Sequence, residues 1–89
     1  MFKDPFESAA DSVTAPSEYC FPITPNDSLD LPQATKALYI GAGGDVTVLP
    51  VRNDAPVTFR SVAAGMVLDV RARAVLATGT TAANIVGLA

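Results

Sequence analysis

The residues of this 89-residue chain that could carry chemistry are nine carboxylates, one thiol and a short glycine-rich run. Cys20 is the single cysteine and the chain has no histidine, which excludes an internal disulfide, a Cys–His nucleophile pair and an ordinary zinc site within one chain. Cys20 lies between Tyr19 and Phe21, and this apolar setting predicts a buried structural thiol. No catalytic nucleophile is therefore expected.

The carboxylates and glycines do not form a recognisable site. Asp27 and Asp30 lack the spacing and the glycine of a calcium loop, so we expect them to accept hydrogen bonds from nearby backbone donors. The glycines of residues 41–44 precede a strand-like sequence, which favours a hairpin turn over a nucleotide-binding loop. The sequence predicts no enzyme activity, no cofactor and no metal. A small hydrolase that uses paired carboxylates stays as an alternative.

The elements that must position these residues are short runs of Val, Leu, Ile and Thr between turn signals. The expected strands cover residues 19–24, 37–40, 46–51, 57–62, 67–75 and 85–88. Pro22 makes the first run either an edge strand or an irregular extended piece. Short connections favour antiparallel neighbours. The sequence therefore predicts an all-β fold, a small antiparallel β-sandwich or barrel of jelly-roll-like form.

Alternation along the strands assigns their faces. In residues 67–75 the apolar Leu68, Val70 and Ala72 share one face, and Asp69, Arg71 and Arg73 share the other. Thr47, Thr58 and Arg60 are expected to point outward. The expected core consists of Leu38, Ile40, Val46, Val48, Val57, Phe59, Leu68, Val70, Ile85 and Leu88.

An extended N-terminal arm, residues 1–18, precedes the predicted β domain of residues 19–89. The arm lacks periodicity and is rich in Ser, Ala, Asp and Pro. Its exceptions are Phe2 and Phe6, which flank Pro5. These aromatics either fold back onto their own core or anchor the arm in the groove of a neighbour.

The low charge of the chain limits its partners. Charged residues make up 17% of the chain, against about a quarter in typical domains, which favours a homo-oligomer. The net charge of −3 and the scattered arginines argue against nucleic acid. No apolar run approaches the roughly 18 residues of a membrane helix, and no secretory signal is evident, so no membrane partner is expected.

Several segments occur in a characteristic order: DPF at residues 4–6, ITPND at 23–27, DLP at 30–32, TKALYIG at 35–41, GDV at 44–46 and VLATGTT at 75–81. With the VRAR strand at 70–73 and the IVGL ending at 85–88, they resemble the spike base proteins of alphaproteobacterial gene transfer agents and related tailed phages. The resemblance spans nearly the whole chain.

The resemblance implies a structural virion protein that is assembled in the host bacterial cytoplasm. Such a protein lies on the capsid exterior, as a pentameric base at the fivefold vertices that carries a head spike or fibre. The implied partners are further copies of this chain, the major capsid protein and a spike or fibre protein.

Two groups of residues are predicted to bind these partners. Phe2, Pro5 and Phe6 would insert into the capsid or an adjacent subunit, because aromatic anchors commonly dominate binding. Arg60, Arg71 and Arg73 would pair with acidic groups, unless they are only solvated residues of the polar face. The alternative function is a carbohydrate-binding or host-surface adhesion module, with Tyr19 and Tyr39 as sugar platforms.

Overall fold

Seven short strands make up the computed structural model, which describes residues 16–89. They are β1 (Cys20–Ile23), β2 (Ala37–Ala42), β3 (Gly44–Pro50), β4 (Val57–Val62), β5 (Met66–Leu68), β6 (Ala72–Leu76) and β7 (Ala83–Leu88). All of the pairings are antiparallel, and no helix occurs among these residues. The predicted all-β fold is confirmed. The predicted arm lies outside the described residues except for its last three positions.

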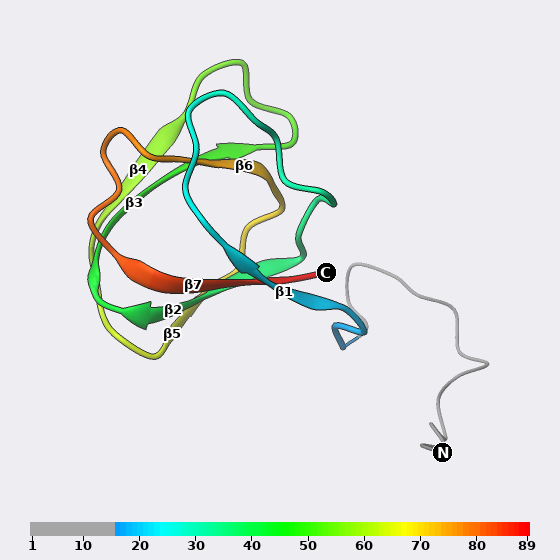
Figure 1. Cartoon of the computed structure of the whole chain (residues 1–89), viewed down its shortest axis with the longest axis horizontal. Helices are drawn as coiled ribbons and strands as arrows, with labels where there is room; N and C mark the ends of the chain where they lie inside the picture. Colours follow the sequence, from blue (N-terminus) through cyan, green and yellow to red (C-terminus); the bar gives the residue numbers. More distant parts are fainter. Residues whose placement is uncertain (1–15) are drawn as a thin grey trace.

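Two sheets form two layers (Figure 1). The larger sheet has the order β1-β7-β2-β5 and the smaller one the order β4-β3-β6. Pro22 lies in the edge strand β1, as predicted. β3 and β4 are the only strands of the described residues that follow one another in sequence and also pair. Short connections were expected to join paired antiparallel strands, and this prediction is wrong for the other short connections. At the other short connections the chain passes from one sheet to the other.

The strand predicted over residues 67–75 is divided between the two sheets. Its first part belongs to β5, which pairs with β2, and its last part belongs to β6, which pairs with β3. Leu68 and Val70 are half-buried and Ala72 is buried, whereas Asp69, Arg71 and Arg73 are exposed. The alternation of faces thus continues across the bend, which explains why the pattern looked like one strand.

The glycine-rich run at residues 41–44 is a corner between the sheets, and the predicted hairpin is wrong. β2 ends at Ala42 and β3 begins at Gly44, and the two strands belong to different sheets. Gly44 has a φ of +155°, and a Cβ there would lie 2.7 Å from the backbone nitrogen of Ala82. Glycine is required because residues 81 and 82 cross so closely over this corner.

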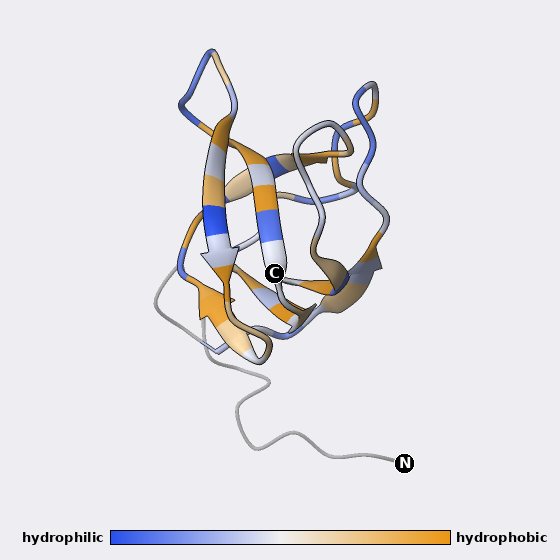
Figure 2. Cartoon of the chain, turned by 90° about the vertical axis from the view of Figure 1, so that its left-hand side faces the viewer, coloured by the Kyte–Doolittle hydropathy of each residue, from blue (hydrophilic) through white to orange (hydrophobic). Residues whose placement is uncertain are grey.

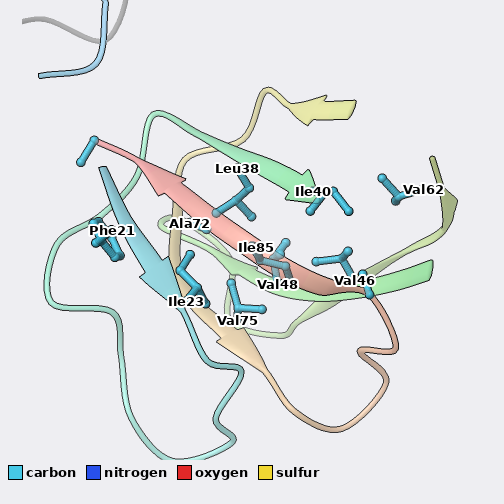
Figure 3. Packing of buried hydrophobic residues seen from close by; sticks show 12 residues of the cluster. Phe21, Ile23, Leu38, Ile40, Val46, Val48, Val62, Ala72, Val75 and Ile85 are labelled. Atoms are coloured by element: carbon cyan, nitrogen blue, oxygen red, sulfur yellow. The ribbon is translucent and has the colours of Figure 1, made fainter. Parts of the chain in front are cut away.

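The core lies between the sheets, where side chains from both layers meet (Figure 3). The core prediction is confirmed for Leu38, Ile40, Val46, Val48 and Ile85, and Phe59, Leu68 and Val70 are half-buried against the same cluster. The core also contains Phe21, Ile23, Val62, Ala72, Val75, Ala82 and Ala89.

Three face assignments need correction. Val57 is exposed because it begins the edge strand β4, where no further strand covers it. Leu88 is only half-buried, since it pairs with Ala37 on the side of the sheet opposite Gly87 and Leu38. Thr47 points away from the core but is buried, because its backbone N–H donates to Thr80 Oγ1 at 2.9 Å. The turn that carries Thr80 covers it.

The free edge of β6 is covered by the long connection between β1 and β2. The backbone N–H groups of Asn26, Leu31 and Thr35 donate to carbonyl oxygens of β6, at 2.8 to 3.0 Å. The fully buried Thr35 adds a side-chain link, since its Oγ1 accepts from the N–H of Ala72 at 3.2 Å and donates to Val70 O at 3.3 Å. The connection between β1 and β2 therefore occupies the place that a further strand would take beside β6, between the two sheets.

Candidate functional site

The polar and ionisable side chains of the described residues form no metal-binding cluster and are paired where they are buried. Within residues 16–89 no group of three or more His, Cys, Asp or Glu could hold a metal ion. Each buried side-chain nitrogen or oxygen in the same range has a hydrogen-bond partner. Nor do these residues contain a helix with the length and apolar character needed to cross a membrane. The candidate functional features are therefore surfaces.

Cys20 is exposed, and the predicted burial of its thiol is wrong. Successive residues of β1 alternate, so that Phe21 and Ile23 point into the core while Cys20 and Pro22 point outward. The Tyr19 ring lies against the Phe21 ring, with centroids 5.4 Å apart. The apolar run around Cys20 thus supplies one buried and two exposed side chains.

Asp27 links two turns that are distant in sequence. Its carboxylate accepts hydrogen bonds from the Thr78 N–H at 2.9 Å and from the Thr78 hydroxyl at 2.7 Å. These bonds lower the pKa of Asp27, because they stabilise its ionised form. The expected local backbone donors instead bond the neighbouring Asn26, whose Oδ1 accepts from the N–H groups of Ser28 and Leu29. The local prediction for Asp27 is therefore wrong.

Asp45 holds the glycine corner to two other segments. Its carboxylate accepts from the N–H of Ser61 at 2.9 Å and lies 3.5 Å from Arg60 Nη1. Ser61 has a φ of +56°, at the irregular end of the β3–β4 pairing. The Asp45 carbonyl also accepts from the N–H groups of Thr81 and Ala82. Arg60 thus lies beside a carboxylate of its own sheet, on an exposed surface.

The three predicted partner-binding arginines lie in two places. Arg60 contacts Asp45 near the start of β3. Arg73 Nη2 donates to the Asn53 carbonyl at 3.3 Å, in the turn that follows β3, and Arg71 precedes β6 near the same turn. The five steps of β3 from Asp45 to Pro50, about 16 Å at roughly 3.3 Å per residue, separate the two places. Arg71 and Arg73 therefore form a pair without Arg60.

An uncharged surface covers the side of the four-stranded sheet that faces away from the core, and we call it the apolar sheet face. Strand pairing places Pro22, Val86, Tyr39 and Val67 in one row across all four strands. Cys20, Leu88 and Ala37 form a second row. Tyr39 and Val67 have exposed fractions of 39% and 51%. In Figure 2 β5, at the bottom, has hydrophobic colours, whereas hydrophilic colours occur in the turns at the top and on strands that face the viewer.

A groove of about 270 Å³ lies between β1 and the connection that follows it, and we call it the β1 groove. It is lined by Phe21, Pro22, Ile23, Thr24, Asn26, Leu29, Asp30, Leu31, Pro32 and Val75. Leu29 has an exposed fraction of 67%, high for a large apolar side chain. The predicted anchors Phe2, Pro5 and Phe6 lie outside the described residues, so the structure does not place them.

The apolar sheet face and the β1 groove were not predicted from the sequence, for two different reasons. The signal for the apolar sheet face is present in the sequence, because residues 37–40 and 85–88 are apolar at successive positions where one face should be polar. The β1 groove has no such signal. It depends on where the connection after β1 lies, and the hydrogen bonds to β6 determine that path.

Comparison with known proteins identifies a relative of the whole chain. No family model matches, and no curated protein matches. A chain in the solved structure of the capsid of a native gene transfer agent (GTA) particle, computed with C5 symmetry, matches with a TM-score of 0.86 and 39% sequence identity. The match covers 98% of this chain and 100% of that chain. The chain therefore belongs to the family of structural capsid proteins of gene transfer agents.

Proposed function

We propose that this protein forms a pentameric base on the exterior of the capsid, at the fivefold vertices, and carries a head spike or fibre. The carrying observation is the full-length similarity to a chain of a GTA capsid, whose structure was computed with C5 symmetry. Fivefold symmetry is the symmetry of an icosahedral vertex. A ring of five copies uses two different surfaces of each copy, because its interface is heterologous.

The described residues supply surfaces suited to such an assembly. The residues that form the two rows of the apolar sheet face are uncharged, and an exposed apolar area of this kind is typical of a contact with another protein. We propose that it faces the major capsid protein. Arg71 and Arg73, which lie at one end of the smaller sheet, pair with acidic groups of the capsid or a neighbouring copy, and Arg60 makes a separate contact. The protein has no catalytic role in this proposal.

The arm supplies the remaining contacts. Phe2, Pro5 and Phe6 insert into the capsid or an adjacent subunit. Pro16 O accepts from Lys36 Nζ at 3.4 Å, and the N–H groups of Glu18 and Tyr19 lie 3.1 and 3.4 Å from Ala89 O. Residues 16–18 are therefore fixed to the β domain, so a test of the arm should remove residues 1–15 and not residues 1–18.

The testing experiment is the mass of the purified protein by light scattering, together with electron cryomicroscopy of capsids with and without it. The proposal expects a mass of five chains and added density at every vertex. A stable monomer that leaves the vertices bare would overturn it. Removal of residues 1–15 should abolish decoration while the circular dichroism of the β domain is retained.

A carbohydrate-binding module is the second candidate, favoured by one observation. Tyr39 is exposed, with uncharged Val86 and Val67 beside it, and an exposed aromatic ring is the kind of side chain that stacks on sugars. Binding of the purified protein on a glycan array, lost in Tyr39→Ala, would support this function. Decoration of capsids that is unchanged by Tyr39→Ala would then show that the two functions use different surfaces.

A further inference from the structure

The β1 groove has the size and chemistry to hold an aromatic side chain. Seven of its ten lining residues are apolar, and its volume of about 270 Å³ exceeds the about 150 Å³ of an engineered apolar cavity that binds benzene. Asp30 is the one charged residue in the lining. No residue of the described range makes a hydrogen bond or ion pair with the Asp30 side chain. The groove therefore suits an aromatic ring beside a cationic group.

The chain itself contains a segment with this chemistry. Residues 1–15 precede the described structure, and they place Phe2 and Phe6 on either side of Lys3. Lys3 is the only basic side chain of these fifteen residues. The segment also carries Asp4, Glu7 and Asp11, so it is the Lys3 ammonium and the two aromatic rings, and not the net charge of the segment, that complement the carboxylate and the apolar lining of the groove.

The described residues fix the point at which this segment joins the domain. From the groove, the chain runs back along β1 through Ile23, Phe21 and Tyr19 to Pro16. The bonds of residues 16–19 to Lys36 and Ala89 hold this end beside the C-terminus (Figure 1). Residues 1–15 are therefore joined to the described domain at Pro16, beside the C-terminus. Phe6 lies ten positions before Pro16, a separation that spans up to about 33 Å when extended, enough to reach a neighbouring copy.

We propose that Phe6 of each copy occupies the β1 groove of the next copy in the ring, with Lys3 beside Asp30. This inference rests on the proposed function, because it assigns the partner of the arm within the pentamer. Each copy then contributes an arm on one side and a groove on the other, which is the heterologous contact that a closed ring requires. Within a ring of five copies the other contacts hold each arm near its groove, so each contact forms at a high effective concentration.

Disulfide trapping between differently tagged copies tests this contact. In a Cys20→Ser background, one copy carries Glu7→Cys, next to Phe6, and the other carries Ser28→Cys, an exposed position next to Leu29 of the groove lining. Mixing and mild oxidation should give a cross-linked pair that contains both tags. Ala64→Cys, exposed in the turn between β4 and β5, is the matched control and should give no such pair with Glu7→Cys.

The outcomes separate this inference from the proposed function. If the protein is a pentamer but the cysteines at positions 7 and 28 give no cross-link between copies, the docking of Phe6 in a neighbouring copy is wrong and the pentamer is unaffected. The same holds if a variant that carries both cysteines cross-links only within single chains. A protein that is monomeric before any substitution overturns the proposed function itself.

A second measurement uses the mass of the ring as a function of protein concentration. Phe6→Ser should raise the concentration at which the ring dissociates by about tenfold or more, because it removes the anchor. Val13→Ser, which removes an apolar residue from the same segment, is the control and should leave that concentration unchanged. Equal behaviour of the two variants would contradict the role of Phe6.

Discussion

The Asp27 carboxylate joins the turn after β1 to the turn after β6, two segments that lie 51 residues apart in sequence. Hydrogen bonds from the backbone and hydroxyl of Thr78 favour its ionised form and lower its pKa from the usual 3.8. A carboxyl group with a lower pKa in the folded state stabilises that state above the pKa of the unfolded chain, and this stabilisation is lost as the pH falls through the folded-state pKa.

Asp27→Asn should therefore lower stability at neutral pH and reduce the loss of stability in acid. The amide keeps one acceptor oxygen but has no charge, so the difference from the unaltered protein should shrink below about pH 3.8. Urea unfolding midpoints at pH 7, 4 and 2.5, at one protein concentration, measure this. Asp54→Asn is the control, because no hydrogen bond to that exposed side chain occurs within residues 16–89. An equal loss at every pH would contradict the role assigned to the charge.

Gly44 is the residue on which the corner between the sheets most directly depends. Gly44→Ala should cost about 3 kcal/mol or more, because a φ of +155° strains an alanine and its Cβ would lie 2.7 Å from Ala82 N. Gly65→Ala is the matched control: it also has a positive φ, but no atom lies within 4 Å of an added Cβ. It should cost about 1 to 2 kcal/mol. Similar unfolding free energies for the two variants would refute the collision at Gly44.

At the scale of elements, the positions of the strands could be predicted from the sequence, but the pairing of the strands could not. Alternation and β-branched residues located the segments now seen as β2, β3, β4 and β7, and they correctly assigned Leu38, Val46 and Ile85 to the core. Pairing depends on where the chain bends, and nothing local distinguishes a hairpin glycine from a corner glycine. The requirement at Gly44 comes from Ala82, which is 38 positions away.

The candidate site was predictable to a smaller extent. Arg71 and Arg73 were correctly placed on an exposed side because alternation is a local property. Their separation from Arg60 was not predictable, since it depends on the order of β4, β3 and β6 in the sheet. The burial of Thr47 likewise depends on Thr80, in a turn that is remote in sequence.

Thr35 determines how the connection after β1 covers the edge of β6. Its side chain is fully buried and bonds both Ala72 N and Val70 O. Thr35→Val keeps the shape but leaves these two backbone groups without that partner, so we expect a loss of about 1 to 3 kcal/mol. Thr24→Val, at an exposed position of the same connection, should change the unfolding free energy by less than about 0.5 kcal/mol. Denaturant titration of both variants provides the comparison, and equal midpoints would contradict the bridging role.

At the scale of the whole molecule, the chain presents two unlike surfaces on one small domain. The apolar sheet face extends across all four strands of the larger sheet, whereas the β1 groove is local and lies at the edge where β1 meets its connection. Under the proposed function the protein contacts both the capsid and its own copies. We assign the extended surface to the first contact and the groove to the second.

This division predicts which substitutions abolish decoration without unfolding the protein. Val67→Glu and Tyr39→Glu alter side chains that are exposed, with fractions of 51% and 39%, so the fold should tolerate them. An unpaired carboxylate buried under the capsid would cost about 3 to 5 kcal/mol, which corresponds to more than a hundredfold in affinity. Val57→Glu is the control, because Val57 is equally exposed, at 41%, but lies on β4 of the other sheet.

The measurement is the number of copies bound per vertex when each purified variant is added to undecorated capsids. Val67→Glu and Tyr39→Glu should leave the vertices bare, Val57→Glu should occupy them, and all three should keep the mass of the ring. A ring that falls apart in Val67→Glu would instead place the apolar sheet face between copies, because the substituted residue would then lie in the subunit contact. Full decoration by Val67→Glu would exclude this face from the capsid contact and leave the arm and the arginines to supply it.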